Sequence, residues 1–472
     1  MSRNTTLLKN TLIILFGKVC TQLISYLLLP VYTTVLSTEE YGTVDLLITY
    51  VTLIAPIITL QMESAVFRFL IDTRGDKAGV TRIVTNSIIC IGGTMGVFLL
   101  AYVLFGYFIA FQYAVPFAAC IIANALVAIL LQVARGLGDN ITYAVGSAIA
   151  GIFTILFNIL FIVVFPFGVT GMLYATALAQ LLGTLYIVVK LRVFQYFSLK
   201  QLNKEVIREM SRYSLPLIPN SLSWWIISVS DRTLVSWFIG VQANGILAVA
   251  TKFATIVVNV FAIFNLSWTE SVAVHIHDKD GDRYISEISN QCFNLFGSCG
   301  LVLIMGCAVF FKYLVGSAFQ AAYDLIPLLV IGSVLNVLQT LYGIIYIGLK
   351  DTKQASRSSF MAAIVNITVD LLLIRVIGLY AAALSTICAM LFLSVYRYCD
   401  VNKFIKIQMN LKNIVILTGA YAITYAVYCI QNPLLHWVWL LVTAAFCIKW
   451  NWKMLAGFIK TARQKLRHRK NA

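Results

Sequence analysis

The feature that most constrains this chain is a succession of long apolar stretches. A membrane-spanning helix needs roughly 20 mostly apolar residues, and about fourteen stretches approach that length. They cover residues 11–36, 43–68, 83–109, 112–134, 141–165, 169–190, 214–239, 244–267, 288–311, 322–347, 357–377, 379–398, 413–431 and 434–452. Only 11% of the residues are charged, against about a quarter in soluble domains. The sequence predicts an all-α, polytopic membrane protein with about fourteen transmembrane helices.

The positive charges are unevenly distributed along the chain, whose formal net charge is +16. Most Lys and Arg residues fall in alternate connections and at the two ends, while Lys312 and Arg375 fall near the opposite side. Because cytoplasmic loops of membrane proteins are enriched in Lys and Arg, both termini are predicted to be cytoplasmic. The tail from Lys460 to Lys470 is expected to lie on anionic membrane lipids, and no nucleic-acid partner is predicted.

The two halves of the sequence resemble each other. Gly-Leu-Gly-Asp at residues 136–139 matches Gly-Leu-Lys-Asp at residues 348–351, and at the same offset Asn158 corresponds to Asp370. Six spans per copy is an even number, so both copies should insert the same way up. The expected domains are a six-helix lobe at 1–190, a cytoplasmic linker at 191–213, a second six-helix lobe at 214–400, two additional helices at 401–458 and a basic tail at 459–472.

The linker carries apolar residues at helical spacing between Ser198 and Tyr213. We expect a surface helix that lies in the cytoplasmic interface, with Ser198 and Gln201 as a capping box at its start. The alternative is a plain solvated linker.

Four cations lie inside or at the edge of apolar stretches: Lys18, Arg68, Arg232 and Lys252. A cation near the centre of a span costs about 2.5–3.5 kcal/mol on insertion scales, so it should face protein or water. Arg by a bidentate fork and Lys by a compact charge both suit a phosphate or diphosphate. The alternative is that these charges pair with acids such as Asp45 or Asp231 and hold the lobes in register.

Polar residues at helical spacing accompany these cations. In the second stretch, Asp45, Thr49, Thr52, Thr59 and Glu63 form one continuous stripe. The residues expected to line a central cavity, suited to sugar hydroxyls and ring faces, are Gln22, Tyr26, Thr49, Thr52, Trp225, Ser228, Asn259, Asn336, Gln339 and Asn366.

Four membrane carboxylates are candidates for proton or sodium coupling, namely Asp45, Glu63, Asp231 and Asp370. A buried carboxylate can exchange its proton as its access to water changes, although structural pairing is the alternative. The ten cysteines include no C-x-x-C pair, so neither metal ligation nor disulfides are expected. No cofactor and no catalytic residue is predicted, since the outward connections are too short for a glycan polymerase or ligase.

Three segments resemble a known family. They are Gly17-Lys18 followed by Pro30 and by Leu-Ser-Thr-Glu-Glu-Tyr-Gly at 36–42, Asp-Arg-Thr-Leu at 231–234 with the glycines that follow it, and the two Gly-Leu-x-Asp turns. They are similar to the polysaccharide flippases of the multidrug/oligosaccharidyl-lipid/polysaccharide exporter superfamily. The resemblance implies fourteen helices, a two-lobed cavity, and Lys18, Arg232, Lys252 and Arg68 as the cations of that cavity.

The resemblance also implies the activity. It is movement of an undecaprenyl-diphosphate-linked oligosaccharide from the inner to the outer leaflet of the bacterial cytoplasmic membrane, by alternating access, for O-antigen, capsule or exopolysaccharide assembly. Expected partners are the lipid-linked oligosaccharide, membrane lipids, a polysaccharide polymerase and glycosyltransferases. The alternatives are an ion-coupled exporter of drugs or small metabolites and a lipid II flippase of the same superfamily.

Overall fold

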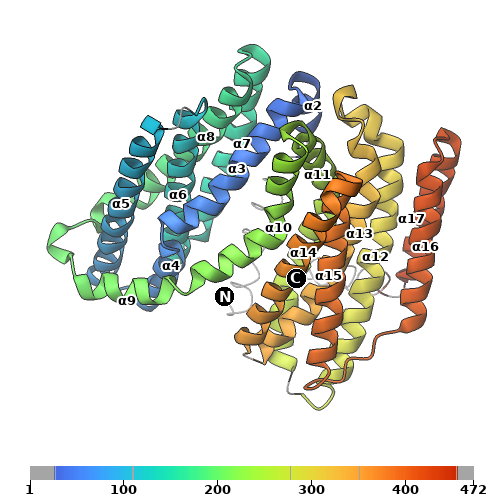
Figure 1. Ribbon diagram of the computed structural model, residues 1–472. Helices are drawn as coiled ribbons and strands as arrows, with labels where there is room; N and C mark the ends of the chain where they lie inside the picture. Colours follow the sequence, from blue (N-terminus) through green and yellow to red (C-terminus); the bar gives the residue numbers. More distant parts are fainter. Residues whose placement is uncertain are drawn as a thin grey trace, which may run out of the picture. The chain divides into compact units, whose positions relative to one another are not determined.

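The computed structural model describes residues 26, 28–108, 111–276, 278–349, 351–452, 454 and 456, and the regular secondary structure of this part of the chain is helical (Figure 1). Twelve of the described helices are long and apolar enough to cross a membrane. They correspond to twelve of the fourteen stretches, and the all-α, polytopic fold class is confirmed. The seventh stretch forms α10 (Leu217–Phe238), and most of the first, 11–36, lies outside the described residues.

The chain divides into two compact units between Val229 and Ser230, within α10. The first unit contains α2 (Leu29–Val35), α3 (Thr38–Ile58), α4 (Met62–Asp72), α5 (Lys77–Phe108), α6 (Ala114–Gly136), α7 (Asn140–Asn158), a π-helical turn (Ile159–Val164), α8 (Gly168–Leu191), α9 (Lys204–Ser214) and the first half of α10. Its core is packed around α6 and α8, where Ala125, Ala134, Ala175 and Ala179 are fully buried. Small residues of this kind let neighbouring helix backbones approach closely.

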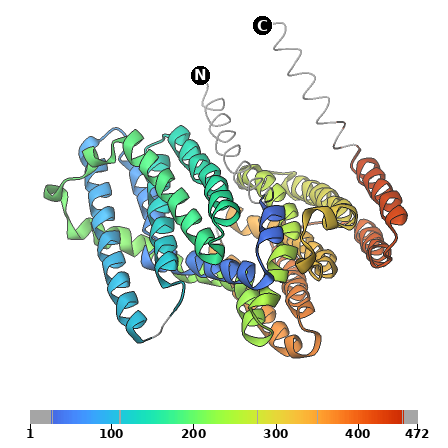
Figure 2. The same cartoon turned by 90° about the horizontal axis from the view of Figure 1, so that it is seen from above.

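The second unit contains the rest of α10, α11 (Val241–His275), α12 (Gly281–Leu314), α13 (Ala322–Gly348), α14 (Thr352–Ile377), α15 (Tyr380–Val401), α16 (Leu411–Cys429) and α17 (Pro433–Trp450). The central helix is α13, which packs against α11, α12 and α15 and buries Leu341, Ile345 and Tyr346 completely. The last two helices, α16 and α17, form a hairpin at the edge of this unit, packed against α12 (Figure 2).

Side-chain caps start the helices that follow the repeated turns. Asp139 accepts a hydrogen bond from the Thr142 backbone N–H at 2.9 Å, and Asp351 accepts one from the Gln354 N–H at 3.1 Å. An N-cap of this type satisfies an N–H group that the helix itself leaves unpaired. The aspartate of each Gly-Leu-x-Asp turn therefore has the same structural role in both units, as a sequence repeat predicts.

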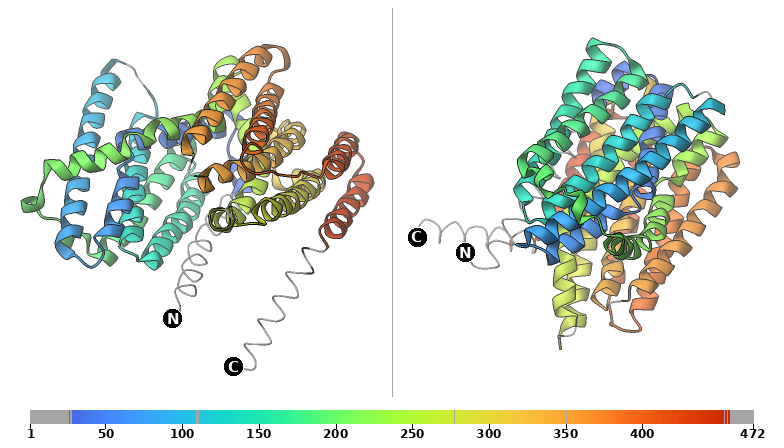
Figure 3. Two further views of the ribbon diagram at one scale, coloured as in Figure 1. Left: turned by 90° about the horizontal axis from the view of Figure 1, so that it is seen from below. Right: turned by 90° about the vertical axis from the view of Figure 1, so that its left-hand side faces the viewer.

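The linker helix begins later than expected. The structure places one 3₁₀ turn at Leu199–Gln201 with no side-chain cap, and α9 starts at Lys204 after Asn203, whose Oδ1 accepts from the Glu205 N–H at 2.8 Å. The capping box of Ser198 and Gln201 was therefore wrong, because Asn203 supplies the cap one turn further on. The helix lies across the ends of α4 and α5 (Figures 1 and 3).

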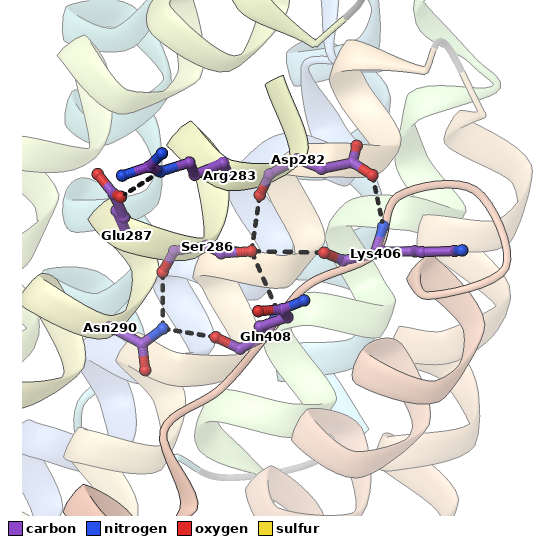
Figure 4. A network of polar contacts seen from close by, with 7 residues as sticks. All are labelled: Asp282, Arg283, Ser286, Glu287, Asn290, Lys406 and Gln408. Carbon is purple, nitrogen blue, oxygen red and sulfur yellow. Dashed lines mark hydrogen bonds and ion pairs between the residues drawn. The ribbon is translucent and has the colours of Figure 1, made fainter. Parts of the chain in front are cut away.

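A row of side chains on α12 holds the segment that leads into the α16–α17 hairpin (Figure 4). Asp282 accepts from the backbone N–H of Lys406 at 3.2 Å, and Ser286 accepts from that of Gln408 at 3.0 Å. Asn290 donates to the carbonyl of Gln408 at 2.7 Å. These three residues are spaced four apart and so share one helix face. The α12 side chains thus satisfy an extended backbone that has no strand partner.

Candidate functional site

The predicted cations have different environments. Arg232 on α10 and Lys252 on α11 belong to the second unit, and both are partly buried. Lys18 lies outside the described residues. Arg68 lies on an exposed face of α4 and pairs with Asp72 at 2.7 Å, with 51% of its side chain accessible. The sequence placed Arg68 inside or at the edge of the second apolar stretch. In the structure the span formed by this stretch ends at Ile58, ten residues before Arg68, so Arg68 is not buried within it.

That span ends in a break, which also interrupts the predicted polar stripe. Leu60 and Gln61 both have positive φ angles, 52° and 55°, a conformation that non-glycine residues rarely adopt. The break separates α3, which carries Asp45, from α4, which carries Glu63. Thr59 still donates a hydrogen bond to Glu63 at 2.8 Å across it. The stripe is therefore two separate faces and not one continuous row.

The first half of α10 is held against α3 and the break. The Trp225 indole donates to the backbone carbonyl of Thr49 at 3.2 Å, and its ring stacks on Tyr50 with centroids 6.4 Å apart. Gln61 donates to the Ser221 hydroxyl at 2.8 Å. The predicted lining residues Thr49 and Trp225 are thus brought together inside the first unit.

The second half of α10 contributes to a buried acidic cluster in the second unit. Asp231 accepts a hydrogen bond from Thr386 on α15 at 2.9 Å and interacts electrostatically with Asp370 on α14. Next to it, Ser230 donates to the side-chain oxygen of Asn366 at 3.1 Å. Asp370 and Asn366 are fully buried. The cluster therefore joins α10, α14 and α15 through two carboxylates and neutral oxygen atoms.

Several polar atoms of this acidic cluster lack a partner among the described residues. They are Oδ1 of Asp231, both carboxylate oxygens of Asp370 and Nδ2 of Asn366. Two neighbouring buried carboxylates cannot both carry a charge without a large electrostatic penalty. Arg232 also interacts with Asp231. The arrangement can hold a proton on one carboxylate or a hard cation, because carboxylate, hydroxyl and amide oxygens are suitable ligands for such a cation.

The structure shows a buried cation that the sequence interpretation missed. Arg397 on α15 is 3% exposed, and its guanidinium donates to Gln339 Oε1 at 2.6 Å, to Ser358 at 3.1 Å and to Ser359 at 2.9 Å. Among the described residues no carboxylate lies within ion-pair distance of it, since Asp400 pairs instead with Lys403 at 2.9 Å. Gln339, expected to line a cavity, is thus a fully buried acceptor for Arg397.

The remaining predicted lining and coupling residues are dispersed. Asn336 is partly exposed and accepts from Gln339 at 2.6 Å, and Thr52 is exposed on α3. The residues that are partly buried are Tyr26, Asp45, Glu63 and Asn259. Gln22 lies outside the described residues, and for Ser228 only the backbone is described. Their part in substrate binding or coupling stays a prediction.

Comparison with known proteins identifies the family. The model of a family described as polysaccharide biosynthesis protein matches residues 7–269, more than half of the chain. The chain belongs to the polysaccharide biosynthesis protein family. No curated protein sequence matches it.

Solved structures with the same fold are transporters and flippases. The polysaccharide biosynthesis protein is similar to the lipid II flippase MurJ in an inward closed conformation, with a TM-score of 0.70, 13% identity, and coverage of 96% of this chain and 100% of that one. An inward-facing multidrug resistance MATE transporter of the MOP superfamily matches with a TM-score of 0.65 and 16% identity, and the match covers 85% of this chain and 96% of that one. A point mutant of the Vibrio cholerae MATE transporter VcmN matches with a TM-score of 0.59 and 16% identity, and the match covers 84% of this chain and 96% of that one. The TM-scores show a shared fold, and with the family match they confirm the resemblance read from the sequence.

Proposed function

We propose that this protein is a flippase that moves an undecaprenyl-diphosphate-linked oligosaccharide from the inner to the outer leaflet of the bacterial cytoplasmic membrane for surface polysaccharide biosynthesis. The polysaccharide biosynthesis family and the fold shared with flippases and exporters support this assignment. The oligosaccharide is carried intact, so no bond is made or broken. Glycosyltransferases would supply the substrate and a polymerase would consume it.

The observation that carries the proposal is the pair of partly buried cations on successive helices of the second unit, Arg232 and Lys252. A cation that is partly buried in an apolar helix is costly unless an opposite charge balances it. The diphosphate is the part of the substrate that carries such a charge. Arg232 would bind it through two parallel N–H groups and Lys252 as a point charge. Lys18 is proposed as a third cation, and exposed Arg68 as a weaker contact.

Ion coupling is proposed to use the acidic cluster of Asp231 and Asp370. Its support is the absence of hydrogen-bond partners for both oxygens of Asp370 among the described residues. A proton or sodium ion bound there would neutralise the pair, and its release would leave two repelling carboxylates beside Arg232. Ion occupancy would therefore change the local charge next to a proposed substrate contact. Asp45 and Glu63 stay as secondary candidates.

The test is exposure of the lipid-linked oligosaccharide on the outer leaflet of cells that depend on this protein. Arg232→Ala and Lys252→Ala should reduce exposure, while the control Arg283→Ala should not, because Arg283 has 83% of its side chain exposed and pairs with Glu287. Full activity of both test variants would show that Arg232 and Lys252 are not the diphosphate contacts. Transport of cationic dyes by cells, with no glycan defect on deletion, would instead favour a drug exporter.

A further inference from the structure

A polar cavity lies in the second unit, and neither the acidic cluster nor the proposed diphosphate contacts line it. It has a volume of about 380 Å³ and is formed by the end of α12, the start of α13, the loop after α16 and the start of α17. This volume falls in the range of about 300–1,000 Å³ that is typical of small-molecule sites. The cavity is therefore large enough for a lipid head group.

Its polar lining combines one cation with amide and imidazole groups. Lys312, Gln320, Gln431 and His436 line it, and the described lining residues include no carboxylate. His436 is 6% exposed, and its Nε2 atom has no hydrogen-bond partner in the described part of the chain. A positive charge beside amide and imidazole groups, in a lining whose described residues include no carboxylate, suits a phosphate group.

One wall of the cavity is held rigidly. Tyr323, which lines it, stacks on Tyr428 with ring centroids 4.2 Å apart. The Tyr428 hydroxyl donates to the Tyr323 carbonyl at 2.9 Å, and the Tyr323 hydroxyl donates to the Tyr428 carbonyl at 3.4 Å. This double connection fixes the start of α13 to the end of α16. The cavity therefore exists without a ligand to organise it.

The surface around the cavity is apolar. Leu434, Val438 and Leu441 on α17 are 78%, 55% and 68% exposed, which is expected for side chains that contact acyl chains. Trp437 lines the cavity and is 48% exposed, with its ring packed edge-on against Phe310 at 5.5 Å. Trp at a helix end is typical of the head-group level of a bilayer. A ligand in this cavity would contact its polar lining at one end and the exposed apolar side chains of α17 at the other.

We propose that this cavity, lined by Lys312, Gln431 and His436, binds the phosphate head group of an anionic phospholipid whose acyl chains lie along α17. The lipid would join the α16–α17 hairpin to α12 and α13 at the head-group level. The proposal is independent of the transported substrate, because none of the proposed diphosphate or coupling residues lines the cavity.

The test is lipid retention by the full-length protein, measured by native mass spectrometry after reconstitution with phosphatidylglycerol or with phosphatidylcholine. The wild type should retain phosphatidylglycerol preferentially. Lys312→Gln should weaken retention about fivefold, the effect of one basic residue near an anionic membrane surface. His436→Phe, which keeps a ring and removes its nitrogens, should also weaken it.

The matched control is Lys449→Gln, which removes a lysine near the other end of α17 that does not line the cavity. It should retain phosphatidylglycerol as the wild type does. Equal loss in Lys449→Gln and Lys312→Gln would overturn the proposal, because it would show general attraction to basic residues. Displacement of the lipid by millimolar inorganic phosphate or glycerol 3-phosphate would also overturn it, by showing that the site binds a soluble anion.

Discussion

Asn86 on α5 and Asn290 on α12 make the same three hydrogen bonds, one set in each unit. Asn86 donates to the carbonyls of Arg82 and Gln201 at 2.7 and 2.9 Å and accepts from the Asn203 N–H at 2.8 Å. Asn290 donates to the carbonyls of Ser286 and Gln408 at 2.8 and 2.7 Å and accepts from the Asn410 N–H at 2.9 Å.

This repeated contact ties the segment before α9 to α5 in the first unit and the segment before α16 to α12 in the second. In both units the segment held by this asparagine has the sequence Gln-x-Asn, at residues 201–203 and 408–410. The Asn of that segment, Asn203 or Asn410, caps the helix that follows, α9 or α16. The segment before the C-terminal hairpin is therefore the counterpart of the segment before the second repeat.

Replacing either asparagine should destabilise the protein. Asn86→Ala removes the hydrogen-bond partner of a carbonyl and of an N–H of the linker, both partly buried, at a cost of about 0.5–1.5 kcal/mol each. Asn290→Ala should cost less, because Asn290 is only partly buried whereas Asn86 is fully buried. Thermal unfolding in detergent measures the order of the two effects. A larger loss in Asn290→Ala, or no loss in either variant, would contradict this account.

Gly343 should be required because of Arg397. A Cβ atom at position 343 would clash with the Arg397 guanidinium, so Gly343→Ala should lower the free energy of unfolding by about 1–3 kcal/mol. In an Arg397→Ala background the same change should cost much less. The control is Gly306→Ala, where a Cβ meets nothing within 4 Å. Additive effects of Gly343→Ala and Arg397→Ala would show that the two sites do not interact.

The spans and the repeated Gly-Leu-x-Asp turns could be predicted because their signals are local. Apolar length identified the helices, and Asp139 and Asp351 cap α7 and α14 within four residues of sequence. The break at Leu60 and Gln61 could not be read in this way, because the run carries no glycine or other usual signal for positive φ. Arg68 was therefore placed at the end of a span, because the apolar residues continue beyond the break.

Arg397 was missed for a different reason. It lies near the end of its apolar stretch and was therefore taken as a cytoplasmic charge, whereas its acceptors come from α13 and α14, far away in sequence. The acidic cluster of Asp231 and Asp370 has the same character, because three helices bring its parts together. The Asn-x₃-Asp spacing of Asn366 and Asp370 on α14 indicated a polar face. It did not indicate that this face contacts α10.

Asp370→Asn should stabilise the fold and reduce transport. The change removes a carboxylate whose burial is uncompensated among the described residues, so the free energy of unfolding should rise by about 1–3 kcal/mol. Transport and its dependence on the coupling ion should fall, because a neutral amide cannot take up and release a proton and binds a sodium ion more weakly than a carboxylate does. The control Asp324→Asn changes an exposed acid at the start of α13. Full transport activity of Asp370→Asn would contradict the coupling role. A lower free energy of unfolding would contradict the claim that the burial of Asp370 is uncompensated.

Cys299 and Cys447 should form an intramolecular disulfide on mild oxidation. Their sulfur atoms, on α12 and α17, are 3.9 Å apart, so a small side-chain rotation brings them to bonding distance. Copper phenanthroline supplies the oxidant, and peptide mass spectrometry should find the linked peptides in the wild type and not in Cys299→Ser. Linkage of Cys447 to another cysteine in preference to Cys299 would contradict the packing of α17 on α12.

The most direct test of the flippase proposal is transport by the purified protein in proteoliposomes. Undecaprenyl-diphosphate oligosaccharide should reach the opposite leaflet with the wild type and with Arg283→Ala. With Arg232→Ala its rate should fall roughly tenfold or more, the loss expected for a charge-assisted contact to phosphate. Unchanged transport in Arg232→Ala, or a wild type that moves lipid II or a cationic dye but not the oligosaccharide, would contradict the account.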